Sequence, residues 1–231
     1  MDISKNNIFI LNGYIVSSFN YLNKGKIYKI STDNLGLISI YSKDMDFYLS
    51  NFSEYNFTLT KGREFFYLKE YDLLKYNHHN SKKYFLFLNI ISEIILKTML
   101  FEMENFAIYS LISEILNLYS DENYIDVLIY FVFNYLSLSG YYITFDNLNN
   151  KKYYFDIEQL EVNSYSNYFY KNRFQYDLTD EEVKLLKSLY YNEIKFEGKS
   201  TNINNRLFGI LINALCINFG VSKFNTFNLF S

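Results

Sequence analysis

The chain of 231 residues contains no proline and no tryptophan, and it has only one cysteine and two histidines. A single cysteine, Cys216, cannot form an intramolecular disulfide, which is typical of a chain kept in a reducing, cytoplasmic compartment. The adjacent histidines His78 and His79, with one distant cysteine, cannot supply a four-ligand zinc site. We therefore expect no metal and no other cofactor. A hydrolase that recruits His78 or His79 into a catalytic triad ranks last among the alternatives.

Glycine is also scarce, with eight in the whole chain and no glycine-rich phosphate-binding motif. The pairs Asp44-x-Asp46 and Glu102-x-Glu104 are the strongest candidates for a hard-cation site, but we interpret them as solvated loop charges. The N-terminal residues lack the basic and apolar segments of a secretion signal. These absences predict a cytoplasmic protein that is not an enzyme.

The chain carries little net charge, a formal −3, and its slight excess of basic residues lies within the first 80 residues. Any surface that binds anions should therefore be local and N-terminal. The chain has 25 tyrosines and 23 phenylalanines. Because asparagine, isoleucine and lysine are abundant too, this richness indicates an A/T-rich coding bias and is weak evidence for base stacking.

The most apolar run is 123–140, which contains no basic residue and ends at Gly140. A membrane-spanning helix needs about 20 mostly apolar residues, so the run is only marginally long enough. It also contains Asp126, Asn134 and two serines, and its flanks lack the basic asymmetry that orients membrane proteins. We interpret it as the central core helix, capped by Ser120 and stopped by Gly140, and expect no membrane contact.

The N-terminal third alternates in the manner of short strands separated by turns. Five such strands with tight turns favour a small closed barrel of the OB (oligonucleotide/oligosaccharide-binding) fold. The expected strands lie within 8–16, 26–30, 37–41, 55–60 and 63–68.

After Leu73 and Leu74 the pattern changes to helical periods, and we expect a barrel domain over 1–76 followed by an all-helical domain over 77–231. The segment 146–177 is irregular, with a β-hairpin expected near 153–162. Thr179 and Glu182 form a capping-box pattern. The fold class is therefore α+β. Helices are expected at 82–100, 104–119, 123–140, 179–191 and from Asn202 or Asn204 to Gly220.

Basic residues on or beside the barrel strands are the remaining functional signal. Lysines can hold phosphates as point charges, and Tyr21, Tyr28 and Tyr41 could stack bases. The alternative is an ordinary solvated β face. The candidate DNA-binding residues are Lys24, Lys26, Lys29, Lys43, Lys61 and Arg63.

The order of these elements resembles the bacterial recombination mediator family RecO. The resemblance runs through Gly13-Tyr-Ile-Val16, the strand-and-turn segment 27–38 that contains Gly36, the barrel exit 67–74, and the helices 84–100 and 106–119. It continues in the end of the core helix, Asn134-Tyr-Leu-Ser-Leu-Ser-Gly-Tyr141.

The resemblance implies an OB-fold domain followed by a helical domain and a non-enzymatic role in DNA repair and recombination. Proteins of this family bind single- and double-stranded DNA, anneal complementary strands, and act with RecR to load RecA onto DNA coated by single-stranded DNA-binding protein (SSB). They bind the acidic C-terminal tail of SSB through the helical domain. In this chain, Arg206 and Lys223 are the candidate residues for that contact.

The chain departs from the RecO pattern in three places. The segment 146–177 has no cysteine, so it can only be a degenerate, zinc-free form of the family's four-cysteine module. The segment 42–47 contains two aspartates where the family is basic, and 224–226 matches the family's C-terminal element only loosely. These departures keep open an alternative: a protein-interaction adaptor of the same fold with weak or no DNA binding.

Overall fold

The computed structural model describes residues 8–22, 24–43, 49–146, 152–165, 172–193 and 202–226. The chain forms two compact units. The first comprises Met1–Asn80 and Leu88–Leu116, and the second comprises Ser81–Phe87 and Asn117–Ser231. Most of the first two helices thus group with the barrel, whereas the sequence prediction assigned them to a helical domain. The candidate cation pair Asp44 and Asp46 lies outside the described residues.

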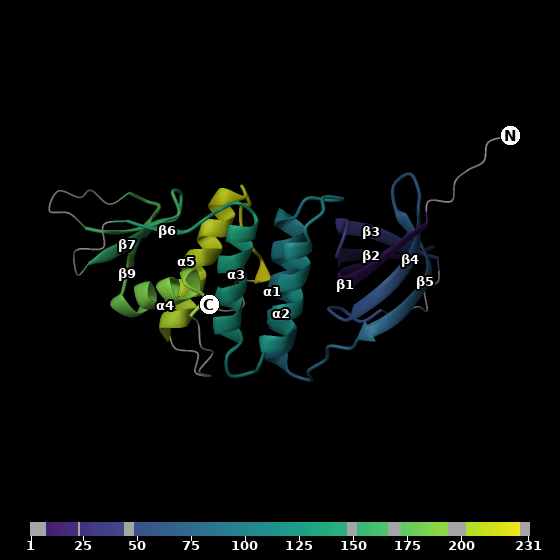
Figure 1. The fold of residues 1–231 in the computed structure, drawn as a ribbon, viewed down its shortest axis with the longest axis horizontal. Coiled ribbons are helices and arrows are strands. Elements are labelled where there is room, and N and C mark those ends of the chain that lie inside the picture. Colours follow the sequence, from purple (N-terminus) through teal and green to yellow (C-terminus); the bar gives the residue numbers. More distant parts are fainter. Residues whose placement is uncertain are drawn as a thin grey trace. The chain divides into compact units, whose positions relative to one another are not determined.

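The N-terminal strands form a closed five-stranded barrel in the order β1-β2-β3-β5-β4, with β4 returning to β1 (Figure 1). All neighbouring pairs are antiparallel except β3 and β5, which run parallel. The fold class predicted from the sequence, an OB-like barrel followed by helices with a small β insertion, is confirmed. The strands are β1 (Ile8–Tyr21), β2 (Gly25–Thr32), β3 (Gly36–Ser42), β4 (Glu54–Lys61) and β5 (Phe66–Lys75).

Alternation of apolar residues explains why these segments close on themselves, because every second side chain points inward. In β3, for example, Ile38 and Ile40 belong to the barrel core and Ser39 between them faces outward. The prediction of a strand over 63–68 is wrong in its bounds, since β5 begins at Phe66 and continues to Lys75. Exposed charged residues such as Glu70 hide the strand pattern beyond Leu68.

Two helices complete the first unit: α1 (Lys82–Thr98), of which Leu88 onward belongs to this unit, and α2 (Phe106–Leu118), up to Leu116. Ser92 of α1 donates a hydrogen bond from Oγ to the carbonyl oxygen of Val16 in the barrel, at 2.9 Å. Tyr14 of β1 and Tyr109 of α2 both donate to the Glu54 carboxylate. Burial raises the pKa of Tyr14 to about 12, so its hydroxyl stays protonated as the donor. These bonds fix α1 and α2 to the barrel wall.

The apolar run forms α3 (Tyr124–Leu138), and its side chains are buried almost all round, as predicted for a core helix. Gly140 follows the helix at φ +89° and allows the Tyr141 amide to donate back to the Leu136 carbonyl, a Schellman-type stop. The prediction that Ser120 caps the helix is wrong: Asn123 occupies the N-cap position, and Ser120 bonds to Asn123 instead. Among the described residues, none of the helices has both the length and the apolar character needed to span a membrane.

The carboxylate of Asp126 lies in the first turn of α3, where it accepts a hydrogen bond from Asn204 of the last helix. Desolvation raises the pKa of this carboxyl, while the bond from Asn204 lowers it by less. Because the folded-state pKa is raised, the protonated form is favoured by folding, and stability falls as pH rises through the titration of Asp126. Charged Asp126 therefore destabilises the fold at neutral pH.

We expect Asp126→Asn to raise the free energy of unfolding at pH 7, because an amide avoids the desolvation cost and still accepts a bond from Asn204. The gain should vanish below about pH 3, where aspartate is protonated in both states. Urea unfolding at the two pH values measures the difference. A loss of stability at pH 7 would contradict this account of Asp126.

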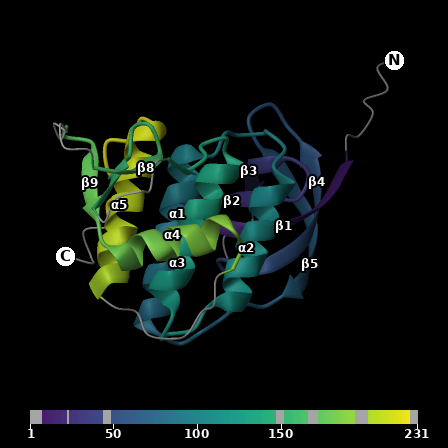
Figure 2. The same ribbon diagram turned by 60° about the vertical axis from the view of Figure 1, so that its left-hand side comes forward.

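The second unit packs α3 against α5 (Asn202–Asn218), and α5 also contacts α4 (Asp180–Tyr190) (Figure 2). The predicted hairpin near 153–162 is present as two antiparallel strands. It belongs to a four-stranded sheet in the order β6-β8-β7-β9, and Asn218 of α5 donates to the Ile157 carbonyl beside it. The sheet strands are β6 (Thr144–Phe145), β7 (Tyr153–Asp156), β8 (Glu161–Ser164) and β9 (Gln175–Leu178).

Candidate nucleic-acid interface

Four aromatic rings gather on the outside of the barrel, and we call them the aromatic cluster. They are contributed by the last residue of β1, the end of β3, the β4–β5 loop and the start of β5. Ring centroids lie 5.8–6.5 Å apart, mostly edge to face. The members are Tyr21, Tyr41, Phe65 and Tyr67.

Strand register explains why these rings face outward. Ile40 and Phe66 are paired across β3 and β5 and point into the core. The next residues, Tyr41 and Tyr67, are paired in the same way and therefore point to the opposite side. The Tyr67 side chain is 43% exposed, so one face of the cluster is open to a ligand.

Two tight turns hold the cluster in place. In the β1–β2 turn, the Lys24 amide donates to the Tyr21 carbonyl at 2.9 Å, and the Tyr41 hydroxyl donates to the Lys24 carbonyl at 2.7 Å. In the β4–β5 loop, the Tyr67 ring lies over Gly62, where an added Cβ would come within 2.2 Å of the ring. The rings are thus packed against backbone that leaves little room for rearrangement.

Four of the six basic residues predicted to bind DNA lie on elements that also carry the aromatic cluster, or next to them. Lys24 is in the β1–β2 turn, Lys43 directly follows β3, and Arg63 is in the β4–β5 loop, and all three are exposed. Lys26, half-buried, is the second residue of β2 and lies opposite Ser42 of β3. Glu64 is the acidic residue in the same β4–β5 loop.

The other two predicted DNA-binding residues are engaged elsewhere. Lys29 donates to the Ser39 hydroxyl at 2.7 Å and lies over the Phe101 ring, 4.4 Å from its centroid. Desolvation lowers the pKa of the Lys29 ammonium. Lys61 forms an ion pair with Glu102 at 2.5 Å, so Glu102 contacts a lysine of the barrel.

The sequence identified some of the aromatic residues and missed others. Tyr21 and Tyr41 lie in the cluster, but Tyr28 is 1% exposed and belongs to the barrel core, so it cannot stack a base. Phe65 and Tyr67 were not among the candidates. Tyr67 directly follows Phe66, which points into the core, so alternation along the strand would have placed Tyr67 on the outside. Using this signal requires knowing that β5 begins at Phe66.

An exposed aromatic surface with nearby cations can bind single-stranded nucleic acid. Aromatic rings stack on any base, and lysine or arginine neutralises the phosphates without reading sequence. In OB folds, the face of strands 2 and 3 with the loops between strands 1–2 and 4–5 binds oligonucleotides. The aromatic cluster and its four cations occupy those parts of this barrel.

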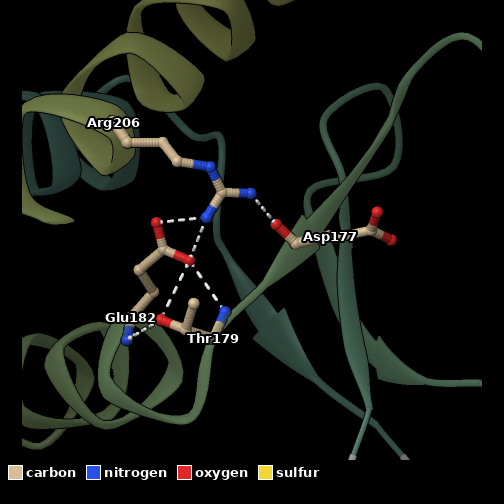
Figure 3. Close-up of polar contacts among 4 residues, drawn as sticks. All are labelled: Asp177, Thr179, Glu182 and Arg206. Atoms are coloured by element: carbon tan, nitrogen blue, oxygen red, sulfur yellow. Dashed lines mark hydrogen bonds and ion pairs between the residues drawn. The ribbon is translucent and has the colours of Figure 1, made fainter.

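Arg206, predicted to bind a partner's acidic tail, is bonded to other residues of the second unit (Figure 3). Its Nη1 contacts both oxygens of Glu182 at 2.6 and 2.5 Å, and its Nη2 donates to the Asp177 carbonyl. Glu182 also completes the predicted capping box by accepting from the Thr179 amide at 2.8 Å. Lys223, the other predicted partner residue, is exposed after the end of α5. The partner role of both residues stays a prediction.

The two histidines lie on the exposed linker between β5 and α1. The His78 ring stacks on the Tyr76 ring, with the two ring centroids 5.7 Å apart. In the parts of the chain that the structure describes, histidine, cysteine, aspartate and glutamate side chains nowhere gather in a group of three that could hold a metal ion.

No protein-family model matches the sequence, and no curated protein matches it.

Proposed function

We propose that the barrel binds single-stranded nucleic acid through the aromatic cluster, without reading its sequence. Tyr67 and its neighbours stack the bases, while Lys24, Lys26, Lys43 and Arg63 contact phosphates. The observation that carries this proposal is the group of four rings, with Tyr67 exposed and the others half-buried, flanked by cations on the part of an OB-like barrel that suits oligonucleotides.

We further propose that this binding serves a RecO-like recombination mediator. Such a protein binds single- and double-stranded DNA, anneals strands, and with RecR helps RecA to load onto SSB-coated DNA during repair. The order of elements supports this role: an OB-like barrel, then three helices ending at Gly140, then a small sheet and two more helices. In this role, Lys223 is the candidate contact for the acidic tail of SSB.

A fluorescence-anisotropy titration with a single-stranded oligonucleotide at 50 and 200 mM salt tests the nucleic-acid proposal. Four phosphate contacts predict a slope of about −2.8 in log K against log salt, so binding should weaken about 50-fold between the two conditions. Lack of binding at 50 mM salt would overturn the proposal. Salt-independent binding would contradict the role given to the cations.

The variant Arg63→Gln tests the phosphate contacts separately. Removing one contact should make the salt slope shallower by about 0.7, with a larger loss of affinity at low salt. Arg173→Gln is the matched control, because Arg173 is also exposed but lies in the second unit. Equal slopes for wild type and Arg63→Gln would remove Arg63 from the interface.

The adaptor alternative is favoured by one observation: Lys29 and Lys61 already have intramolecular partners. An adaptor would bind the acidic SSB tail in calorimetry but would show no anisotropy change with the oligonucleotide. The mediator predicts both signals.

A further inference from the structure

The loop between α1 and α2 lies against the barrel at the start of β3, within the first unit. The Glu102 amide donates to the Leu37 carbonyl of β3 at 2.9 Å, and Phe101 forms a parallel bridge with Leu37. Gly36 permits this approach, because an added Cβ would lie 1.9 Å from the Met103 carbonyl oxygen. Gly36 also has φ +64°, which disfavours any other residue. The contact therefore depends on main-chain bonds and on a glycine.

This loop contacts the same two lysines that the sequence assigned to DNA binding. Phe101 covers the Lys29 ammonium, and the Glu102 carboxylate pairs with Lys61. The bonding partner of Lys29, Ser39, lies two residues before Tyr41 on the same outward side of β3, about 7 Å along the strand. A nucleic-acid chain that stacks on the cluster would therefore pass close to Lys29.

The ion pair with Lys61 can be exchanged. The side chains of Lys61 and Glu102 are 44% and 49% exposed, and an ion pair at such an exposed position contributes little to folding. A phosphate could replace the carboxylate at Lys61 at little cost to the fold. While Glu102 remains in place, however, it cancels the charge of Lys61 and adds a negative charge near the path of the phosphates.

We propose that the α1–α2 loop is an intramolecular competitor of nucleic acid. Glu102 pairs with Lys61, and Phe101 covers Lys29, so that neither lysine can contact a phosphate while the loop is in place. The loop lowers the affinity of the barrel, and its displacement adds phosphate contacts to the interface. This inference rests on the proposed nucleic-acid binding and specifies how that site is regulated.

The test is the anisotropy titration with the full chain and a single-stranded oligonucleotide, comparing wild type with Glu102→Gln. Freeing Lys61 for one phosphate should steepen the salt slope by about 0.7 and tighten binding about fivefold at 0.1 M salt. Glu104→Gln is the matched control: Glu104 is exposed in the same loop, and its substitution removes the same charge. Only the ion-paired residue should give the full effect.

A double substitution separates the ion pair from a general change of charge. In a Lys61→Gln background, Glu102→Gln should no longer tighten binding about fivefold, since the lysine that it would free is absent. Equal affinity of wild type and Glu102→Gln, or equal effects of the two glutamate substitutions, would overturn the inference while leaving the proposed function intact. Absence of binding by every variant would overturn both.

Discussion

We expect Arg206→Ala to lose about 2–3 kcal/mol of unfolding free energy, because it leaves the Glu182 carboxylate without its cation. The Glu182 side chain is 1% exposed, and removing one partner of a buried ion pair costs about 3–5 kcal/mol. The expected loss is smaller because the Arg206 side chain is 45% exposed, so water can partly solvate the carboxylate after the substitution. The bonds from Thr179 to Glu182 remain and limit the damage further.

Urea unfolding of four proteins measures this effect. Arg206→Lys should recover only part of the stability, since one ammonium cannot reproduce the planar fork that contacts both Glu182 and the Asp177 carbonyl. Arg206→Ala combined with Glu182→Gln should be more stable than Arg206→Ala alone, because no buried charge is left unpaired. Arg63→Ala is the exposed control and should change stability by about 0.5 kcal/mol or less.

An Arg206→Ala protein as stable as wild type would show that the pair with Glu182 contributes nothing to folding.

The same variant also matters for partner binding. A tail-binding assay on Arg206→Ala is informative only if the protein remains folded. Lys223→Ala is the cleaner test of the predicted partner surface, because Lys223 lies after α5 and is exposed.

Local sequence patterns predicted most of the fold because they act within one element. Alternation in β2 and β3, the apolar faces of the helices, the Thr179 capping box and the Gly140 stop all depend on neighbours a few residues away. The four-stranded sheet was not predicted, because it depends on residues far apart in the sequence. Its strands have two to four residues, and β9 pairs with β7 across a gap of about 20 residues, which no local pattern encodes.

The candidate site was only partly predictable, because the residues that a surface lysine contacts can be distant from it in the sequence. Lys29 and Lys61 have the same pattern as Lys24 and Lys26, yet a loop 41 residues beyond Lys61 pairs with that lysine and contacts Lys29. Tyr28 resembled an exposed ring because its strand is rich in polar residues. The β-bulge in β1, between Ile15 and Ser17, changes which residues of that strand face the core.

We expect Tyr67→Ala to weaken binding of single-stranded oligonucleotide by about 5- to 150-fold, which corresponds to about 1–3 kcal/mol for one stacked base. Tyr67 is the most exposed ring of the aromatic cluster and lies 5.8 Å from Tyr41, edge to face. Removing it deletes a stacking surface and leaves every cation in place. The salt slope should therefore stay unchanged while the affinity falls at all salt concentrations.

Two variants control for this reading of Tyr67. Tyr67→Phe keeps the ring and should bind nearly as wild type does, since stacking does not need the hydroxyl. Tyr142→Ala removes a ring that is 64% exposed in the second unit and should leave binding unchanged. If Tyr67→Ala binds as tightly as wild type, bases do not stack on this ring. A shallower salt slope in Tyr67→Ala would instead indicate that the ring positions a neighbouring cation, so that nucleic acid is held by charge alone.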